Sequence, residues 1–396
     1  MQNESSEPAE TGNELGTFVY ENWRSALTGA PADSTVEYPL FSDGRVTGEI
    51  AEGLGPYQVF NCIADVSLDP HRPVLMLRVS YHAQWSYRDL ETTDVARYHG
   101  GTTSDEFAAL LSLCFGIRLK AGNPTRWFSK DGDPRGRPWS FREAGQPDPT
   151  IATTAWGPIV PAASGQHQLE RTRRLAEFPQ LSPNQSIAVV RAARLYQDAL
   201  WVAESQPALA WLLLVSAVEA AAGEWRRGQD PPAMRLQASK PHLAALLEEH
   251  GGPDLVERAA AMLVDSLGAT TKFIKFCITF LPAAPSVRPS KEHRVPWTKS
   301  YLRVSLGTIY NYRSIALHEG IPFPAPMCTP PGIYGDALAE RLAYGGAGAM
   351  GGIWSVSDLP MFLHVFEHIA RNALLSWWDS LAPPAGAPPE GADSPP

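Results

Sequence analysis

The hydrophobic pattern of this chain changes its period near residue 182, and this change constrains the fold more than any other feature of the sequence. Before it, short apolar runs at 35–41, 57–68 and 73–85 are separated by Gly, Pro and Asp, which is typical of strands joined by turns. After it, apolar residues recur at the spacing of an α-helix. The sequence therefore predicts an α+β half, mainly an antiparallel sheet, followed by an all-α half.

The length of 396 residues exceeds the usual size of one domain, so we expect two domains, each with its own core. The boundary falls in 178–185, whose two prolines and polar residues indicate a linker or a helix start. We therefore expect an α+β domain at 15–180 and an all-α domain at 183–382. The polar residues 1–14 and the proline-rich residues 383–396 are predicted to be disordered tails.

Capping residues and apolar periodicity place the expected helices. The α+β half contains one helix, at 104–122, with Ser104 as its N-cap and Gly122 near its end. The basic, proline-rich stretch 282–297 is expected to form a long surface loop. In the all-α half, helical periodicity covers residues 186–205, 207–225, 241–250, 254–267, 301–320 and 359–381.

Charge and cysteine content narrow the class of protein. A net charge of −9 argues against a protein that coats nucleic acid, because such binding depends on phosphate neutralisation, so any RNA contact requires a local basic patch. The four cysteines form no CxxC pair, which fits a reducing cytoplasm without zinc knuckles or disulfides. The N-terminus lacks the apolar region of a secretory signal, and the apolar run 208–222 is expected to be too short and too polar to span a bilayer. We expect a soluble, cytoplasmic protein without membrane contact.

His364, Glu367 and His368 match the zinc motif HxxEH, in which histidines four residues apart share a helix face. The glutamate that completes such sites comes from a helix well downstream, and only the end of one predicted helix and the tail follow His368. We therefore expect no metal here, and two histidines whose hydrogen bonds are satisfied.

Residues 346–351 fit the pattern GxGxxG, but no strand precedes them and no βαβ unit surrounds them. A flexible loop is expected, with a lid or a substrate contact as the alternative.

An arginine followed by a histidine at helical spacing is a further candidate for chemistry. The pairs separated by four to six residues are Arg235 and His242, Arg288 and His293, and Arg313 and His318. The first two spans contain Pro241 and Pro289, which disfavour an unbroken helix. Only Arg313 and His318 lie within continuous helical periodicity.

Arg313 continues the stripe of Leu306 and Ile309 at 100° per residue, so it points inward or into an interface. A buried arginine is costly unless it is paired, and Glu219 is a candidate partner. His318 lies about 140° further around an ideal helix, so the two side chains point in different directions. They can meet only if the long arginine side chain reaches across, if the last turn is distorted, or if two protomers share the site. The alternative to a functional pair is that His318 is an ordinary surface histidine and Arg313 forms a structural salt bridge.

The segment Tyr310 to Gly320, YNYRSIALHEG, resembles the Y-x-x-R-S-x-x-x-H-G-type ending of the ApeA-like branch of HEPN domains. The segment 211–220, WLLLVSAVEA, resembles the apolar helix of the same branch that ends in Ser-Ala-hydrophobic-Glu. This resemblance implies a helical bundle that dimerises and cleaves RNA without a metal or another cofactor, with two Arg–His pairs at the interface. Many active members carry Asn, Asp or His directly after the arginine, where this chain has Ser314.

The resemblance implies Arg313 and His318 as the catalytic pair, supported by Glu219, Ser314 and Tyr310. His318 would accept the proton of a ribose 2′-hydroxyl, and Arg313 would stabilise charge on the attacked phosphate, which leaves a 2′,3′-cyclic phosphate end. The macrodipole at the helix C-terminus would favour a protonated imidazole, so His318 is a candidate proton donor as well as an acceptor.

A basic stretch precedes this pair: from 272 to 313 there are eight basic residues and one acidic residue, Glu292. It is either an RNA-binding patch or a solvated loop. We expect a defence-type endoribonuclease, anti-phage or toxin-like, whose α+β half binds a trigger or partner. The alternative is an inactive HEPN-fold module that binds RNA or nucleotides or serves as a dimerising scaffold. The candidate RNA-binding residues are Lys291, Arg294, Lys299 and Arg303.

Overall fold

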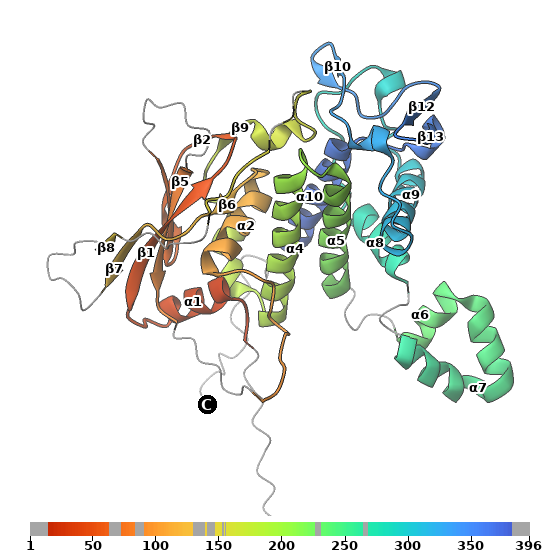
Figure 1. Cartoon of the computed structure of the whole chain (residues 1–396). Coiled ribbons are helices and arrows are strands. Elements are labelled where there is room, and N and C mark those ends of the chain that lie inside the picture. Colours follow the sequence, from red (N-terminus) through yellow and green to blue (C-terminus); the bar gives the residue numbers. More distant parts are fainter. Residues whose placement is uncertain are drawn as a thin grey trace, which may run out of the picture.

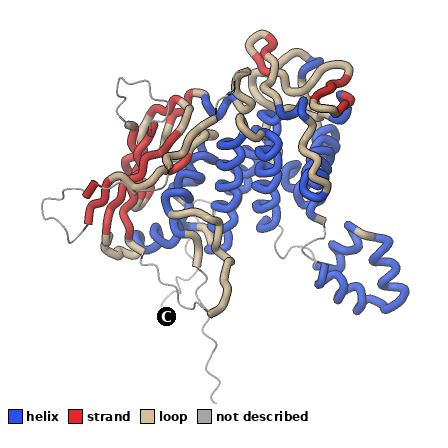
Figure 2. Tube along the Cα trace, viewed as in Figure 1, coloured by secondary structure: helices blue, strands red, loops and turns tan. Residues whose placement is uncertain are grey.

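The computed structural model describes residues 15–62, 73–83, 91–129, 139–140, 147–152, 154, 156–225, 231–263 and 268–381. The predicted tails, 1–14 and 383–396, lie outside these residues, as do the last parts of the strands expected at 57–68 and 73–85. Figure 2 shows the strands of the large sheet on one side of the molecule and the helical bundle on the other. The predicted order of an antiparallel sheet region followed by a mostly helical half is confirmed.

A seven-stranded sheet forms the N-terminal half, and its described strands pair in antiparallel fashion, as expected. The central strand β1 (Ser34–Phe41) pairs with β5 (Pro73–Tyr81) on one side and with β6 (Lys120–Ala121) and β7 (Arg126–Ser129) on the other. The remaining strands are β3 (Ile50–Leu54) and β4 (Tyr57–Asn61) beyond β5, β8 (Trp139–Ser140) beyond β7, and the separate parallel pair β2 (Arg45–Thr47) and β9 (Gln166–Gln168).

Helix α2 (Thr103–Phe115) packs against the sheet, and the ring of Phe107 stacks on Tyr57 of β4 with 4.4 Å between the ring centroids. The helix begins after the N-cap Thr102 rather than at Ser104. It ends at Gly116, whose φ of 68° gives the left-handed C-cap that glycine adopts without steric cost. The predicted helix 104–122 is therefore too long at its C-terminal end.

The expectation of a single helix in this half is wrong, because α1 (Phe18–Leu27) precedes the sheet. Thr17 caps it by accepting a hydrogen bond from the backbone N–H of Tyr20. The carboxylate of Glu106 in α2 accepts hydrogen bonds from the first two backbone N–H groups of α1, at 3.0 and 2.6 Å. A buried acid from another helix thus satisfies donors that a helix start leaves unpaired.

The C-terminal half is helical, as predicted, and two short hairpins lie between its last two helices. Ser182 begins the first of these helices with a capping box formed with Gln185. The helices are α4 (Pro183–Val202), α5 (Pro207–Trp225), α6 (Pro232–Ser239), α7 (Pro241–Leu263), α8 (Ala269–Thr279), α9 (Lys299–His318) and α10 (Leu363–Asp379), and the short α3 (Arg173–Ala176) precedes them. The hairpin strands are β10 (Ile333–Tyr334), β11 (Ala337–Leu338), β12 (Gly346–Ala349) and β13 (Gly352–Ser355).

Helices α6 and α7 form a hairpin with a small core of its own, and Figure 1 shows it standing apart from the bundle. The two helices expected at 241–250 and 254–267 are both present within α7, and they meet at Gly252, whose φ of 66° is not helical, directly before Pro253. Residues 264–267 of the second helix lie outside the described residues. The sequence pattern does not predict α6 or α8. The buried residues of this hairpin are Leu236, Ala244, Val256 and Ala260.

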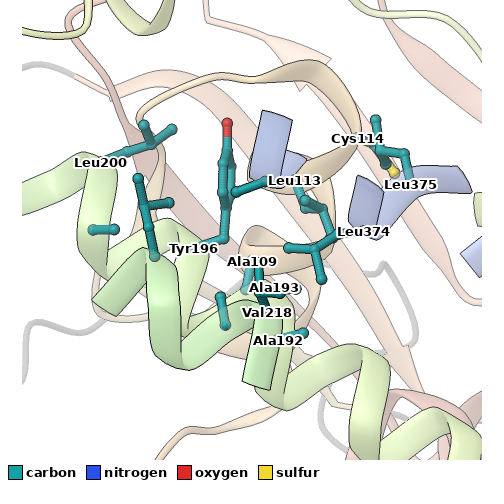
Figure 3. Close-up of a cluster of buried hydrophobic side chains, with 14 of the residues drawn as sticks. Ala109, Leu113, Cys114, Ala192, Ala193, Tyr196, Leu200, Val218, Leu374 and Leu375 are labelled. Carbon is teal, nitrogen blue, oxygen red and sulfur yellow. The ribbon is translucent and has the colours of Figure 1, made fainter. Parts of the chain in front are cut away.

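The sheet and the bundle share one hydrophobic core, so the expectation of two separate cores is wrong. Figure 3 shows Leu113 and Cys114 of α2 close to Leu374 and Leu375 of α10, with Tyr196 of α4 beside them. All of these side chains are buried. The boundary region 178–185 therefore joins two halves that bury each other's apolar surface.

Polar contacts also tie the halves together. Arg118, which is buried, donates hydrogen bonds to the carbonyl oxygen of Leu200 and to the carboxylates of Asp43 and Glu204, at 2.6 to 2.8 Å. Arg371 of α10 donates to the carbonyls of residues 113 and 114, the last turn of α2. Because a buried charge is costly without partners, these pairs fix how the helical half meets the sheet half.

Helix α5 is the central helix of the bundle and packs against α4, α8, α9 and α10 (Figure 1). Among the described helices, it is the one long and apolar enough to cross a membrane by length and composition, so the expectation that this run is too short and too polar is wrong. The core helix of a soluble protein passes the same test. Its Trp211 is fully buried between the stacked rings of Phe323 and Phe366, with centroids 5.2 and 5.1 Å away.

Replacing Trp211 by alanine is expected to lower the free energy of unfolding by about 3–5 kcal/mol, because it removes a large buried ring and leaves a cavity. Urea unfolding followed by circular dichroism measures the change. The matched control is Trp156→Ala, since Trp156 is 87% exposed and its loss is expected to cost about 0.5 kcal/mol or less. Equal destabilisation by both variants would contradict the central role of α5.

Candidate functional site

Glu219 of α5 binds two side chains of α9, Tyr310 and Arg313, and we call these three residues the Glu219 cluster. Nη2 of Arg313 donates a hydrogen bond to Oε2 of Glu219 at 2.8 Å, and the hydroxyl of Tyr310 donates to Oε1 at 2.7 Å. The guanidinium of Arg313 lies over the ring of Tyr310, 5.5 Å from its centroid. The expected pairing of Arg313 with Glu219 is confirmed.

The apolar stripe of α9 brings this cluster together. Leu302, Leu306 and Ile309 are fully buried, and they hold the helix against its neighbours α5 and α8. Tyr310 and Arg313 follow on the same side of α9, so the helical period carries them to Glu219.

Burial and hydrogen bonding set the protonation state of Tyr310 in the Glu219 cluster. Burial raises the pKa of Tyr310 to about 12, and its hydrogen bond to Glu219 acts in the same direction, so the phenol stays protonated at neutral pH. The side chains of Arg313 and Glu219 are 23% and 21% exposed. Nε of Arg313 has no hydrogen-bond partner among the described residues. The cluster therefore combines a fixed guanidinium with donor capacity that its protein contacts leave unused.

His318 is the last residue of α9 and is exposed. The helix runs without a break from Arg313 to His318, so the separation of about 140° that an ideal helix gives is retained. Within the described part of one chain, no hydrogen bond or ion pair involves His318. The structure thus brings Glu219, Tyr310 and Arg313 together and leaves His318 apart from them. Ser314, half-buried, makes no side-chain hydrogen bond to a described residue.

The candidate RNA-binding residues lie away from the Glu219 cluster. All four residues are exposed. Arg294 also donates a hydrogen bond to the carbonyl oxygen of Pro289 at 2.7 Å. Lys299 and Arg303 stand in the first turns of α9, about 15–20 Å along the helix axis from its C-terminal turns. The basic loop 282–297, which precedes α9, is partly exposed and contains a 3₁₀ turn at Lys291–His293.

The HxxEH residues of α10 line a cavity of about 280 Å³. His368 is satisfied, because its Nε2 lies 3.0 Å from the carbonyl oxygen of Ala283, but Nδ1 of His364 is buried without a hydrogen-bond partner. The expectation of two satisfied histidines is therefore wrong for His364. Among the described residues, no group of three or more His, Cys, Asp or Glu side chains is arranged to hold a metal ion.

The GxGxxG segment is a hairpin rather than the expected flexible loop. Its two strands, β12 and β13, turn at Met350 and Gly351, which have φ values of 50° and 85°. No helix follows to present backbone N–H groups to a phosphate, because β13 comes next.

Glu340 is a buried residue that lines the same cavity, and the sequence pattern does not reveal it. Its two carboxylate oxygens accept hydrogen bonds from Arg288 and from the backbone N–H of Val295. Arg288 therefore belongs to an internal ion pair and not to a free basic patch. Glu340 lies 52 residues from Arg288 and 45 residues from Val295, so no periodic pattern relates it to them.

Comparisons with known proteins do not suggest a function for this chain. No family model matches the chain, and no curated protein or solved structure matches it. The Glu219 cluster, with His318 at the end of the same helix, is therefore the basis on which a function has to be argued.

The buried imidazole of His364 is expected to make the free energy of unfolding depend on pH. Burial lowers its pKa to about 4, with a further contribution from His368. Between pH 6.5 and 4 the unfolded chain binds a proton at this position and the folded chain does not, so stability falls as the pH falls. The loss expected from this group is about 3 kcal/mol.

Urea unfolding of the wild type and of His364→Gln between pH 7 and pH 4 measures this contribution. The variant is expected to lose less stability over this range, and the control His242→Gln, at an exposed position, is expected to follow the wild type. Parallel curves for wild type and His364→Gln would show that His364 titrates normally in the folded protein.

Proposed function

We propose that this chain is a metal-independent endoribonuclease of the HEPN type, which acts in the cytoplasm as a homodimer formed through its helical half. The observation that carries the proposal is the Arg313–Glu219 pair, which fixes in place an arginine whose side chain stays 23% exposed. Such a guanidinium suits phosphate, because its planar fork matches phosphate oxygens and keeps its charge at all relevant pH values.

In this proposal His318 accepts the proton of a ribose 2′-hydroxyl, and the resulting oxygen attacks the adjacent phosphorus. The bond from phosphorus to the 5′-oxygen of the next nucleotide breaks, and this oxygen takes up the proton that the imidazole of His318 had accepted, which leaves a 2′,3′-cyclic phosphate and a 5′-hydroxyl. Arg313 stabilises the charge on the phosphate oxygens during this step. Glu219 and Tyr310 hold Arg313 in position.

Two copies are needed to complete the site. In one chain Arg313 faces α5 and His318 faces away from it, so a histidine from a second copy is the simplest way to place an imidazole beside each arginine. Apolar side chains flank His318: Leu317 is 53% exposed and Ile321 is 55% exposed. Contact between copies at this end of α9 would bury them and exclude water from the reacting groups.

Lys299 and Arg303 give the RNA strand a path along α9. Both are exposed, and both lie on the helix that ends at the proposed catalytic pair. Because the chain as a whole carries a net charge of −9, binding is confined to such local positive surfaces. Lys291 and Arg294 lie just before this path in the chain.

The α+β half is proposed to bind a trigger or partner, as expected of anti-phage or toxin-like systems. Support comes from the shared core and from the contacts of Arg118 and Arg371, through which a change in the sheet half reaches α4 and α10. A rigid connection of this kind lets binding at one half alter the other.

A second candidate function is a non-catalytic module that binds RNA or nucleotides, or a dimerising scaffold. The exposed position of His318 favours it, as does Ser314 after the arginine. In that case Arg313 and Glu219 are a structural ion pair between α5 and α9.

Cleavage of mixed-sequence RNA in EDTA distinguishes the two. We expect the wild type to leave 2′,3′-cyclic phosphate ends and both Arg313→Ala and His318→Ala to be at least about 100-fold slower, because each removes one catalytic group. Glu219→Gln is expected to be about 10-fold slower, since it weakens only the positioning of Arg313. Matched controls are Arg258→Ala and His242→Ala, exposed residues of α7.

Equal rates for the wild type and the two alanine variants would remove this pair from the mechanism. Absence of cleavage by the wild type, with RNA binding that depends on Arg313, would support the binding module instead. Product-end mapping by mass spectrometry separates hydrolysis by a contaminating metal-dependent nuclease from the proposed chemistry, because EDTA suppresses the former and its ends differ.

A further inference from the structure

The cavity beside α10 is a second candidate site, separate from the Glu219 cluster. It lies where four parts of the chain meet: α10, the β10–β11 hairpin with the segment that follows it, the loop between α8 and α9, and a turn of the N-terminal half. Its volume of about 280 Å³ is close to the lower limit of small-molecule pockets. The apolar residues of its wall include Pro161, Ala162, Pro285, Val287, Leu338 and Val365.

Glu367 supplies a carboxylate to this cavity. It is buried, and Oε1 accepts a hydrogen bond from the hydroxyl of Tyr196 at 2.6 Å. Among the described residues, no cationic side chain forms an ion pair with it. Glu340, which also lines the cavity, differs because Arg288 neutralises it. A carboxylate that is buried in an apolar wall with one neutral hydrogen-bond partner costs folding free energy. A positively charged ligand bound beside Glu367 would offset that cost.

His364 adds a second polar group without a protein partner. Its ring lines the cavity, and Nδ1 is buried without a hydrogen bond. Burial lowers its pKa, so the imidazole is neutral at pH 7 and one ring nitrogen is a hydrogen-bond acceptor. His368, by contrast, has its Nε2 directed at the carbonyl of Ala283. The unused polar groups of the cavity are thus an acid and a neutral imidazole.

We propose that this cavity binds a small organic cation, an amidinium or amine with an apolar body, through the carboxylate of Glu367 and the ring of His364. The lining residues with charge are all acids, Asp336, Glu340 and Glu367, so anionic ligands are disfavoured. A planar amidinium matches a carboxylate with two parallel hydrogen bonds, and the proline, valine and leucine side chains receive the apolar body.

The ligand would also connect the two halves of the protein. Pro161 and Ala162 belong to the sheet half, whereas His364 and Glu367 belong to α10. A ligand that contacts both and binds only the folded chain raises the apparent stability of the whole protein. The inference is independent of RNA cleavage, since no residue of the Glu219 cluster lines the cavity.

Binding of benzamidine to the full chain tests the proposal, with benzoate as an anion of the same size. Titration calorimetry and thermal unfolding measure the two ligands. We expect saturable, one-to-one binding of benzamidine at millimolar or lower concentration, at least about 10-fold weaker binding of benzoate, and a higher Tm with benzamidine alone.

Glu367→Gln keeps an acceptor for Tyr196 and removes the charge, and it is expected to weaken benzamidine binding at least about 10-fold. Glu249→Gln, an exposed substitution on α7, is the matched control and is expected to bind as the wild type does. Ala162→Phe, at the exposed rim of the cavity, narrows it without touching the buried acid and is expected to have the same effect as Glu367→Gln. The proposal would be overturned by equal binding of benzoate, by no binding of benzamidine, or by unchanged binding to both cavity variants.

Discussion

The enclosure of helix α5 is the constraint on which the bundle and the proposed active site depend. This helix is apolar on nearly every side, so it is stable in water only where other helices surround it. The same helix carries Glu219, and an acid near such a core requires a partner. Arg313 and Tyr310 of α9 provide it. The packing that buries α5 thus also fixes the guanidinium that we propose to bind phosphate.

A second consequence of this architecture is that the sheet half is not an appended sensor on a flexible linker. Helix α2 contributes to the same core as α4 and α10, and Arg118 and Arg371 bind main-chain carbonyls across the junction. Movement of one half relative to the other would expose apolar surface and leave buried charges unpaired. A trigger bound by the sheet half would therefore act by changing how helices pack.

The sequence predicted the elements whose signals are local. The strands β1, β4 and β5 and the helices α4, α5 and α9 have regular apolar periodicity, and Ser182 and Thr298 cap α4 and α9. The pairing of Arg313 with Glu219 follows from the apolar stripe of α9. Helix α8 was missed because its Thr, Ile and Phe residues are equally typical of a strand. Helix α2 was made too long because a left-handed C-cap at Gly116 cannot be distinguished by pattern from an interior glycine. The shared core, the Glu340–Arg288 pair and the cavity depend on contacts between distant segments, which periodicity does not contain.

We propose that two copies of the chain together form an RNA-cleaving site, with Arg313 from one copy and His318 from the other. The decisive measurement is RNA cleavage by a mixture of the inactive Arg313→Ala and His318→Ala proteins under conditions that allow subunit exchange. If the site is shared, heterodimers contain one complete site, and random exchange restores about a quarter of wild-type RNA cleavage. If the mixture stays inactive while wild-type protein treated in the same way retains its activity, the arginine and the histidine do not act across two copies, and the claim is contradicted.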